Sequence, residues 1–406
     1  MLGWANQFNI FCYLDNQQYA GEGYECLLGV NARSSFDDTK FFNSIDAFLS
    51  KGSWYFGHLS YELKNNLYHT NDEHNQIGFP RYFFFSPQSV VALKDNELII
   101  YADNADIIYN DILQTKITEH SPTDPIALQQ RLNKEAYQQI IKKLQQHILR
   151  GDCYEINFCQ EFFMEDAVID PLLIFQKLVS ISPTPFSAFY KLNEKYLVCA
   201  SPERFLKKQG SKIISQPMKG TARRDLENLK NDEALKNNLY RDAKERAENV
   251  MIVDLVRNDL SRICKEATVK VDELFGIYTY PQVHQMVSTI SGILKDDVSF
   301  SQIIDATYPM GSMTGAPKHK VMELIRGYEP VSRGLFSGSV GYIDPEGNFD
   351  FNVVIRSILY NALNKYVSYY AGSGITFYSD AGKEWEECLL KVEAIKKVLA
   401  DYEPKS

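Results

Sequence analysis

Two pairs of glutamates are spaced so that they could bind a metal ion. Glu245 and Glu248 lie three residues apart in "NDEALKNNLYRDAKERAENVMIVDLVRNDL", and Glu384 and Glu387 lie three apart in "DAGKEWEECLLKVEAIKKVL". Both segments have helical periodicity, so each pair shares one helix face. If the two faces meet, four carboxylates form an oxygen-rich site that suits Mg²⁺ better than Zn²⁺. The spacing equally fits exposed side chains beside Lys244, or glutamates favoured by the dipole of a first helical turn.

Lys219 stands in the stretch "SQPMKGTARRD", residues 215–225, between a proline and a glycine. The strand-like runs before it place this lysine just past the end of a strand. A lysine in such a turn is usually a solvated charge that keeps the loop off the core. The local sequence therefore predicts an exposed Lys219 and by itself assigns it no chemistry.

Three further features have both a chemical and a purely structural interpretation. Gly372 and Gly374 in "YYAGSGITFYSD" form a Gly-x-Gly turn whose N–H groups could face an anion, although tight-turn geometry alone explains the glycines. Arg356 interrupts the apolar run "FNVVIRSI", so it either reaches solvent at a strand end or points inward to a carboxylate. His284 in "YPQVHQMVST" is most simply a hydrogen-bonded core histidine.

The composition argues against several classes of protein. The chain has 406 residues, 45% of them apolar, enough for one large α/β body or for two or three ordinary domains. Its net charge of -9 and the lack of any Lys/Arg-rich run predict no nucleic-acid partner and no membrane partner. No export signal and no long apolar span is recognisable. Seven scattered cysteines without C-x-x-C spacing fit a cytoplasmic protein.

The predicted elements divide the chain at one seam, the polar stretch "TEHSPTDPIALQQ" at 118–130. Residues 1–120 form a sheet-rich region, because runs such as "RYFFFSPQSVVAL" and "NELIIYAD" are separated by turn-forming residues. Residues 131–400 begin with a helix that Asn133 caps and Gly151 ends. Strands follow in "CYEINFCQEF", "FSAFYKL" and "KYLVCAS", with a turn at Asn193 between the last two.

Nine motifs, in order, make the chain similar to the chorismate-utilising enzymes. The resemblance runs from about Leu132 to Leu399 through "GDCYEINFCQ", "ASPERF", "PMKGT", "DAKERAENVMIVDLVRNDL", "MGSMTGAPK", "FSGSVGYI", "VIRSI", "AGSGI" and "EWEECLLK". Residues 1–120 resemble more loosely the N-terminal region of anthranilate synthase large subunits, with "YECLLG" where a tryptophan-pocket motif stands. The implied fold class is α/β (α+β). It is a single large body of two packed antiparallel β-sheets with outer helices, to which both regions contribute.

Two positions indicate which reaction of the family applies. Isochorismate and salicylate synthases have a water-activating lysine at the position of Glu155, so the resemblance argues against that branch. Most members that use ammonia have glutamine there, so Glu155 departs from both patterns and its role is open. The lysine of "PMKGT" is typical of the branch that makes 4-amino-4-deoxychorismate from chorismate, a step towards 4-aminobenzoate and folate. Anthranilate synthases, the alternative, have alanine at that position.

The resemblance also implies a mechanism. Replacing a ring hydroxyl by an amine at the same carbon, with retention, is naturally explained by two displacements and an acid for the leaving hydroxyl. Lys219 attacks ring carbon 2 as the hydroxyl leaves carbon 4, and ammonia then attacks carbon 4 and expels the lysine. Glu203 in "SPERF" acts as acid and then as base. The lysine must be neutral for part of the cycle, which burial or nearby cations such as Arg223 favour.

The same resemblance implies the remaining site residues. Mg²⁺ on the two glutamate pairs holds the ring carboxylate of chorismate. The residues implied to line the rest of the substrate site are Thr221, His284, Ser312, Tyr342, Arg356, Gly372, Gly374 and Lys391.

The expected partner follows from the source of the ammonia. The sequence contains no Gly-x-Cys-x-Gly nucleophile elbow of a glutaminase, so a separate glutamine amidotransferase subunit is expected to supply ammonia. Little sequence follows "EWEECLLKVEAI", so removal of pyruvate is expected to need a second enzyme. A non-catalytic paralogue that only activates an amidotransferase is a further alternative, and the presence of Lys219 and all four glutamates argues against it.

Overall fold

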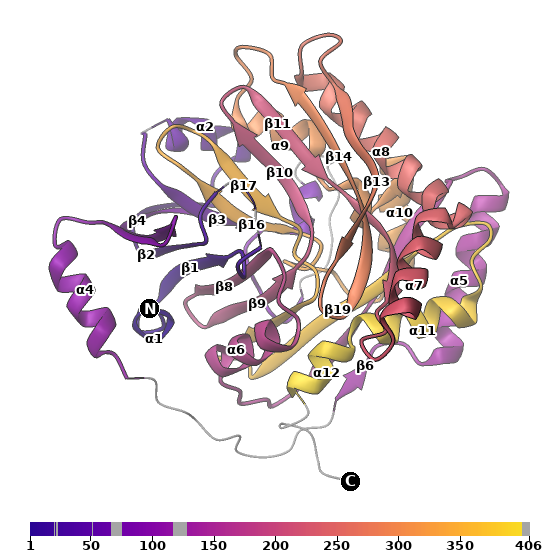
Figure 1. Ribbon diagram of the computed structural model, residues 1–406, viewed down its shortest axis with the longest axis horizontal. Coiled ribbons are helices and arrows are strands. Elements are labelled where there is room, and N and C mark those ends of the chain that lie inside the picture. Colours follow the sequence, from indigo (N-terminus) through magenta and orange to yellow (C-terminus); the bar gives the residue numbers. More distant parts are fainter. Residues whose placement is uncertain (20, 22, 51, 66–74, 117–127, 400–406) are drawn as a thin grey trace.

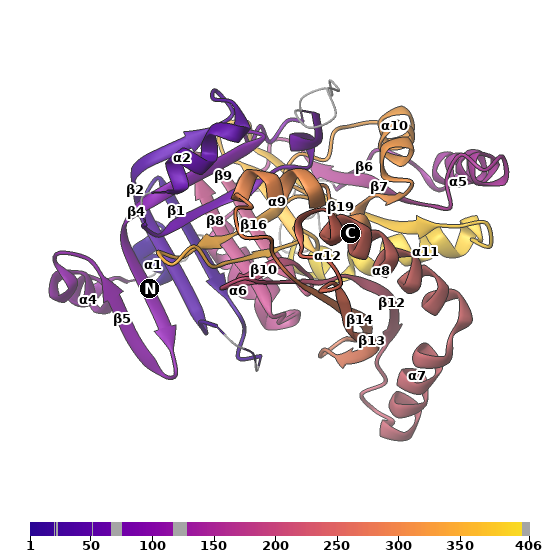
Figure 2. The ribbon, with the colours of Figure 1, turned by 90° about the horizontal axis from the view of Figure 1, so that it is seen from above.

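The computed structural model of the chain describes residues 1–399 except 20, 22, 51, 66–74 and 117–127. A large antiparallel sheet forms its centre, with helices on the outer surfaces (Figures 1 and 2), as expected for the implied fold class. The predicted seam at 118–130 lies outside the described residues up to 127, and its end forms β6 (Gln129–Gln130). None of the helices that the structure describes combines the length and apolar content needed to cross a bilayer.

The first half of the sheet carries the strands predicted from "CYEINFCQEF", "FSAFYKL" and "KYLVCAS", and each strand pairs antiparallel with the next. In spatial order the strands are β7 (Glu155–Met164), β19 (Tyr366–Ile375), β18 (Ser357–Asn361), β9 (Lys195–Ser201), β8 (Phe186–Leu192), β1 (Ile10–Asp15), β2 (Cys26–Asp37) and β4 (Tyr82–Lys94). The predicted turn between β8 and β9 is confirmed, with Asn193 at φ 54°.

The second half of the sheet is also antiparallel throughout. Its strands in spatial order are β3 (Tyr55–Leu59), β16 (Ser339–Ile343), β17 (Phe349–Asn352), β10 (Arg204–Gln209), β11 (Lys212–Gln216), β14 (Val283–Ile293) and β13 (Lys270–Thr279). Three short strands extend the edges: β12 (Met218–Arg223) on β14, β15 (Gly315–Ala316) on β7, and β5 (Glu97–Tyr101) on β4.

The two halves are joined at β4, which pairs with β2 on one edge and with β3 and β5 on the other. The hydrogen-bond ladder is therefore continuous, so the two implied sheets are two halves of one sheet. Contacts between their inner faces hold the halves together. The Asn352 side chain of β17 donates to the Phe186 carbonyl of β8 at 2.9 Å, and the Arg204 guanidinium of β10 lies 4.7 Å from the Phe186 ring centre. Strands from both regions of the sequence take part, since β1 pairs with β8 and β3 with β16.

Helices cover both outer faces because one side of each is apolar. In α5 (Lys134–Leu149), Asn133 caps the helix by accepting from the Ala136 N–H, and Tyr137, Ile141 and Leu144 are buried, as predicted. The other helices on this face are α6 (Pro171–Ile181), α10 (Lys318–Tyr328), α11 (Ala381–Lys391) and α12 (Glu393–Leu399). On the second half of the sheet, α8 (Ala243–Ile263) and α9 (Phe300–Thr307) pack into the hydrophobic core to which the strands of this half also contribute side chains.

The structure corrects two predicted helices, each of which is interrupted. The segment expected as one helix splits into α7 (Leu229–Arg241) and α8, because Asp242 adopts an extended conformation and caps α8 through the Glu245 N–H. The other breaks at Val392, between α11 and α12. The remaining helical elements are α1 (Leu2–Ala5), α2 (Ile45–Leu49), α4 (Ala105–Gln114), η1 (Phe42–Ser44), η2 (Tyr61–Leu63) and η3 (Gly311–Met313).

Candidate active site

A cavity of about 400 Å³ lies where β7, β12, β14 and β19 meet α8 and α11. Figure 1 shows α8 and α11 on the side of the molecule away from β2, β4 and α4. The cavity gathers most of the residues that the sequence indicated, although they come from distant parts of the chain. Those that line it are Glu203, Lys219, Thr221, Glu245, Glu248, Ser312, Arg356, Gly372, Gly374, Glu387 and Lys391.

Lys219 is buried, which corrects the prediction of a solvated turn residue. It is the second residue of β12, where the register against β14 shifts between Met218 and Thr221 and Gly220 has φ 89°. Such a bulge re-aims a side chain, and here the Lys219 side chain is 11% exposed. Its ammonium donates a short hydrogen bond to Glu155 Oε1 of β7.

The charges around Lys219 also differ from the expectation. Burial acts to lower the pKa of Lys219, but the carboxylates of Glu155, Glu248 and Glu387 outweigh it and raise the pKa above its usual value. The charged groups that set the pKa of Lys219 are therefore anions, whereas the sequence predicts that cations such as Arg223 favour the neutral amine. In its resting state the lysine is protonated.

Glu203, between β9 and β10, has the protonation behaviour of a general acid and base. Its side chain is buried, and burial raises its pKa to about 7, although the positive charges of Lys219 and Arg356 act in the opposite direction. A carboxyl group with this pKa exchanges its proton readily at neutral pH.

The four predicted metal-binding glutamates surround the Lys244 ammonium. Lys244 Nζ lies 3.6 Å from Glu248 Oε1 and 3.5 Å from Glu384 Oε1. Burial acts to lower the pKa of Lys244, but Glu248, Glu384, Glu245 and Glu387 together raise it. The two helix faces therefore do meet, which the sequence left open, although Glu384 lies behind Lys244 and does not line the cavity.

The donor set is suited to a hard cation. Glu248 Oε1 and Glu384 Oε2 are buried and without a hydrogen-bond partner, so each has a free oxygen lone pair. Burial also raises the pKa of Glu248 to about 8, which a cation beside it would reverse. Among the described residues, however, no three acidic, histidine or cysteine side chains already stand as a metal-binding group. The chemistry fits Mg²⁺, and the Lys244 ammonium lies where a cation would neutralise the cluster.

Basic groups lie at other points of the cavity wall. Arg356 is held at φ 49°, and burial lowers its pKa while Tyr280 and Glu203 act against that shift. Lys391 of α11 donates to the Gly372 carbonyl at 2.8 Å and pairs with Glu387 at 2.7 Å. These cations suit a substrate with more than one carboxylate.

Gly372 and Gly374 lie in strand β19, so the predicted Gly-x-Gly turn is wrong. A Cβ atom at Gly374 would lie 2.6 Å from both Glu155 Oε1 and Lys219 Nζ. Glycine is required there because the ion pair packs directly against the strand.

His284 does not line the cavity, which corrects its predicted role. It is 2% exposed, and its ring nitrogens lie 3.0 Å from Asp232 Oδ1 and 3.0 Å from the Thr279 hydroxyl. The next residue of β14, Gln285, lines the cavity instead, accepting from Thr221 at 2.9 Å and donating to the Gly220 carbonyl at 2.6 Å. Side chains alternate along a strand, so adjacent residues face opposite sides.

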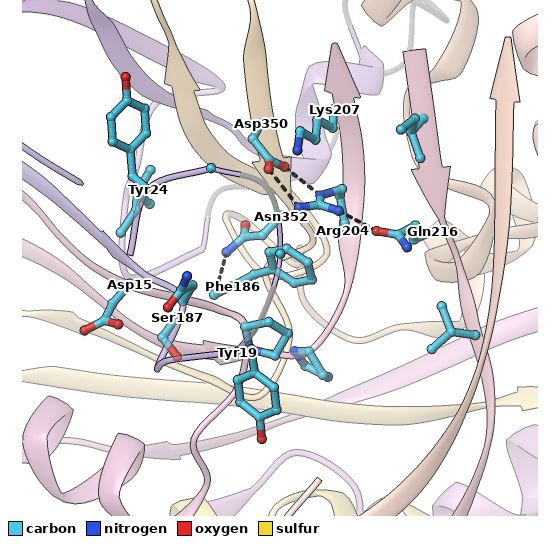
Figure 3. Close-up of a pocket in the computed structure, with 18 of the residues that line it drawn as sticks. Asp15, Tyr19, Tyr24, Phe186, Ser187, Arg204, Lys207, Gln216, Asp350 and Asn352 are labelled. Atoms are coloured by element: carbon cyan, nitrogen blue, oxygen red, sulfur yellow. Dashed lines mark hydrogen bonds and ion pairs between the residues drawn. The ribbon is translucent and has the colours of Figure 1, made fainter. Parts of the chain in front are cut away.

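Tyr342 lines a second cavity of about 460 Å³ between the two sheet halves, so its predicted role at the active site is wrong as well. Leu27, from the "YECLLG" motif, lines this cavity too. Figure 3 shows Arg204 between Asp350 and Gln216, with Asn352 reaching the Phe186 backbone.

Residues of the candidate active site that the sequence did not single out include Phe336, Tyr370, Lys244 and Gln285. Strand alternation would have identified Gln285, but the others have no local signal.

Comparison with known proteins shows which family the sequence matches. A family model described as chorismate binding enzyme matches residues 12–397. The chain is 34% identical over 332 residues to an anthranilate synthase component I-like protein of Synechocystis sp., covering 80% of this chain and 68% of that protein. It is 37% identical over 285 residues to aminodeoxychorismate synthase component 1 of Escherichia coli, covering 69% of this chain and 62% of that protein. The alignment thus spans less than two thirds of the Escherichia coli relative.

Solved structures share the fold. Anthranilate synthase component I from Streptococcus pneumoniae superposes with a TM-score of 0.79 at 22% identity, covering 95% of this chain and 93% of that chain. The isochorismate synthase MenF from Escherichia coli has a TM-score of 0.78 at 17% identity, covering 98% of this chain and 91% of that chain.

Proposed function

The chain belongs to the chorismate-binding enzymes, and from that premise we propose that it is component I of an aminodeoxychorismate synthase. It converts chorismate and ammonia to 4-amino-4-deoxychorismate and water. The observation that carries this proposal is a buried lysine, Lys219, in one cavity with a carboxyl group, Glu203, whose pKa is about 7. This pair has the two groups that an exchange of hydroxyl for amine requires, a nucleophile and an acid.

The proposed reaction has two displacements. The neutral amine of Lys219 attacks ring carbon 2, and both ring double bonds shift as the C4–O bond breaks, with Glu203 giving its proton so that water leaves. Ammonia then attacks carbon 4, both double bonds shift back, and the C2–N bond to Lys219 breaks. Glu203 takes the surplus proton from the new ammonium group. Attack at alternate carbons in two steps accounts for retention at carbon 4.

The remaining wall residues would orient the substrate. Glu245, Glu248, Glu384 and Glu387 would hold Mg²⁺, which when bound neutralises the ring carboxylate of chorismate. Arg356 and Lys391 would bind the second carboxylate, on the enolpyruvyl group. Holding both ends of the dianion aligns ring carbon 2 with the lysine.

The proposed partner is a glutamine amidotransferase subunit that supplies ammonia, because the sequence shows no glutaminase nucleophile elbow. The product keeps its enolpyruvyl group, so a separate lyase would remove pyruvate to give 4-aminobenzoate. All seven cysteines are buried and unpaired, which supports a reducing, cytoplasmic location.

Anthranilate synthase component I is the second candidate, because relatives with that name match over a similar share of the chain. One is the anthranilate synthase component 1 of Saccharolobus solfataricus, 32% identical over 79% of this chain and 74% of that protein. It is less favoured because Lys219 lines the cavity at the position where the family resemblance gives anthranilate synthases an alanine.

One assay tests the proposal. The purified chain is incubated with chorismate, MgCl₂ and an ammonium salt, and the products are identified by mass spectrometry. We expect 4-amino-4-deoxychorismate with ammonium and no product with glutamine alone. Anthranilate and pyruvate as products would establish the second candidate, and glutamine-dependent turnover by the isolated chain would contradict the need for a partner.

A further inference from the structure

Glu155 has no part in the chemistry described so far, and we propose that it is the base that deprotonates Lys219 before the amine attacks the ring. This inference rests on the proposed function, in which Lys219 is the nucleophile. It gives a catalytic role to a position where the family resemblance leads one to expect glutamine or lysine.

The hydrogen bonds of Glu155 differ from those of a structural glutamate on the same strand. Glu161 of β7 is also buried, and it accepts from Arg131, Tyr366 and Ser368, so both of its oxygens are bonded. Glu155 is 1% exposed, accepts from Lys219 through Oε1, and has no partner at Oε2. Its carboxylate is therefore dedicated to one donor, the group whose proton must be removed.

The cavity favours a transfer within this pair over loss of a proton to solvent. Lys219 is 11% exposed and Glu155 only 1%, so the carboxylate already in contact with the ammonium is a more direct proton acceptor than bulk solvent. Moving the proton from Lys219 Nζ to Glu155 Oε1 converts an ion pair into two neutral groups and leaves the net charge unchanged. While Lys219 is a neutral amine, an ionised Glu155 beside it would be an uncompensated buried charge, which is costly.

The other charged groups around the pair are mainly carboxylates. Glu248 and Glu245 of α8, Glu387 of α11 and Glu203 are close enough to interact with Lys219, and Lys391 is a nearby cation. These carboxylates hold the proton on the resting lysine, so a base in direct hydrogen-bond contact is needed to remove it before the amine can attack.

The proton balance closes over one cycle. The Lys219 ammonium gives its proton to Glu155, and the nitrogen lone pair forms the bond to ring carbon 2. In the second displacement the electron pair of the C2–N bond returns to nitrogen, and Lys219 takes back the proton from Glu155. Chorismate and ammonia are consumed, 4-amino-4-deoxychorismate and water are formed, and no further reactant is needed.

A simple counter-ion role makes the opposite prediction, which allows a sharp test. If Glu155 only neutralises Lys219, then Glu155→Gln lowers the pKa of Lys219 and makes more neutral amine available, so the reaction is unchanged or faster at pH 7. If Glu155 is the base, the same variant loses the proton acceptor. Formation of the covalent adduct then falls by roughly 10²-fold relative to wild type at pH 7, and this deficit relative to wild type narrows as the pH rises.

The experiment mixes each variant with chorismate and MgCl₂ without ammonia and follows the adduct on Lys219 by intact mass, from pH 6 to pH 10, alongside turnover with ammonium. Glu155→Asp keeps a carboxylate and should lie between wild type and Glu155→Gln. The matched control is Glu161→Gln, which neutralises a buried glutamate of the same strand outside the cavity, and thermal melts check the fold of each variant.

The outcomes separate the two claims. A wild-type chain that forms neither adduct nor 4-amino product contradicts the proposed function itself. A wild-type chain that is active, with Glu155→Gln equal to it or faster at pH 7, overturns the base role and leaves the proposed function standing. A Glu155→Gln variant no slower than Glu155→Asp also overturns it.

Discussion

The two large cavities of this molecule are similar in volume, but they differ in whether the buried polar atoms around them have hydrogen-bond partners. Glu248, which lines the candidate active-site cavity, and Glu155 and Glu384, which lie next to it, each have a buried oxygen without a partner. In the cavity between the sheet halves, Arg204 binds Asp350 through two hydrogen bonds of 2.9 and 3.0 Å and also contacts Gln216. No residue lining the inter-sheet cavity has a buried, unpartnered side-chain oxygen or nitrogen within the part of the chain that the structure describes.

This contrast separates reactivity from structural support. Unpartnered buried charges destabilise a fold, so they persist where a substrate or ion completes them. Fully paired polar groups rigidify the structure and have little left to offer a ligand. Size does not identify the candidate site, since the inter-sheet cavity is slightly larger, about 460 Å³ against about 400 Å³.

Lys219→Ala should produce the largest effect, because it removes the nucleophile and leaves only substrate binding. We expect formation of 4-amino-4-deoxychorismate to fall by roughly 10³-fold or more, with a much smaller change in chorismate affinity. Steady-state kinetics with ammonium, together with isothermal titration of chorismate, measures both. A variant with a comparable rate, and a wild-type chain without a Lys219 adduct, would reduce the lysine to a charged wall residue.

Substitutions in the glutamate cluster should produce the second-largest effect on turnover. Glu248→Gln and Glu387→Gln exchange a carboxylate for a neutral isostere, so turnover should fall by roughly 10²-fold or more while the fold persists. Glu386→Gln is the matched control on the same helix, because its side chain is 66% exposed and pairs with Lys134. Chelation with EDTA should stop the wild-type reaction, and activity that survives EDTA would contradict the metal assignment.

The pKa of Glu203 predicts an intermediate effect with a definite sign. Burial raises this pKa to about 7, and the first displacement needs the protonated acid. The rate of adduct formation should therefore be highest below pH 7 and fall about tenfold per pH unit above it, wherever this step is limiting. Stopped reactions analysed by intact mass across this range provide the profile. In Glu203→Gln the step should be slow at every pH, and a retained descending limb would assign it to another group.

Asp350→Asn, in the inter-sheet cavity, should affect stability and not chemistry. It removes the charge that pairs with the half-buried Arg204, and we expect a loss of about 1–3 kcal/mol in the free energy of unfolding. Urea unfolding measures this loss, and kcat with saturating ammonium should stay near the wild-type value. A fall in kcat without a loss of stability would show that the two cavities are coupled.

Tyr342→Phe should have the smallest effect. Tyr342 lies in the inter-sheet cavity, so kcat/KM for chorismate should change by no more than roughly twofold. A loss of tenfold or more would return Tyr342 to the substrate site and would contradict the position of this residue in the structure.

The amino-acid sequence was sufficient for those features that follow from local pattern. Alternation and turn residues predicted the strands around Asn193, and Asn133 with helical spacing predicted α5. The ordered motifs predicted the family and the fold class, and helical spacing predicted that each glutamate pair shares one helix face. These succeed because capping, periodicity and motif order are properties of neighbouring residues. The same patterns failed at Asp242, where a residue able to cap a helix interrupts a longer periodic segment.

Only the tertiary structure decided which side chains meet. Local sequence predicted a solvated Lys219, but the bulge in β12 turns it toward Glu155, 64 positions earlier in the chain, and so sets its charge. Because adjacent side chains of β14 point to opposite sides of the strand, Gln285 lines the cavity and His284 does not. The position of Lys244 among four glutamates depends on α8 packing beside α11. Burial, charge and protonation arise from contacts between elements distant in sequence, and no local pattern specifies those contacts.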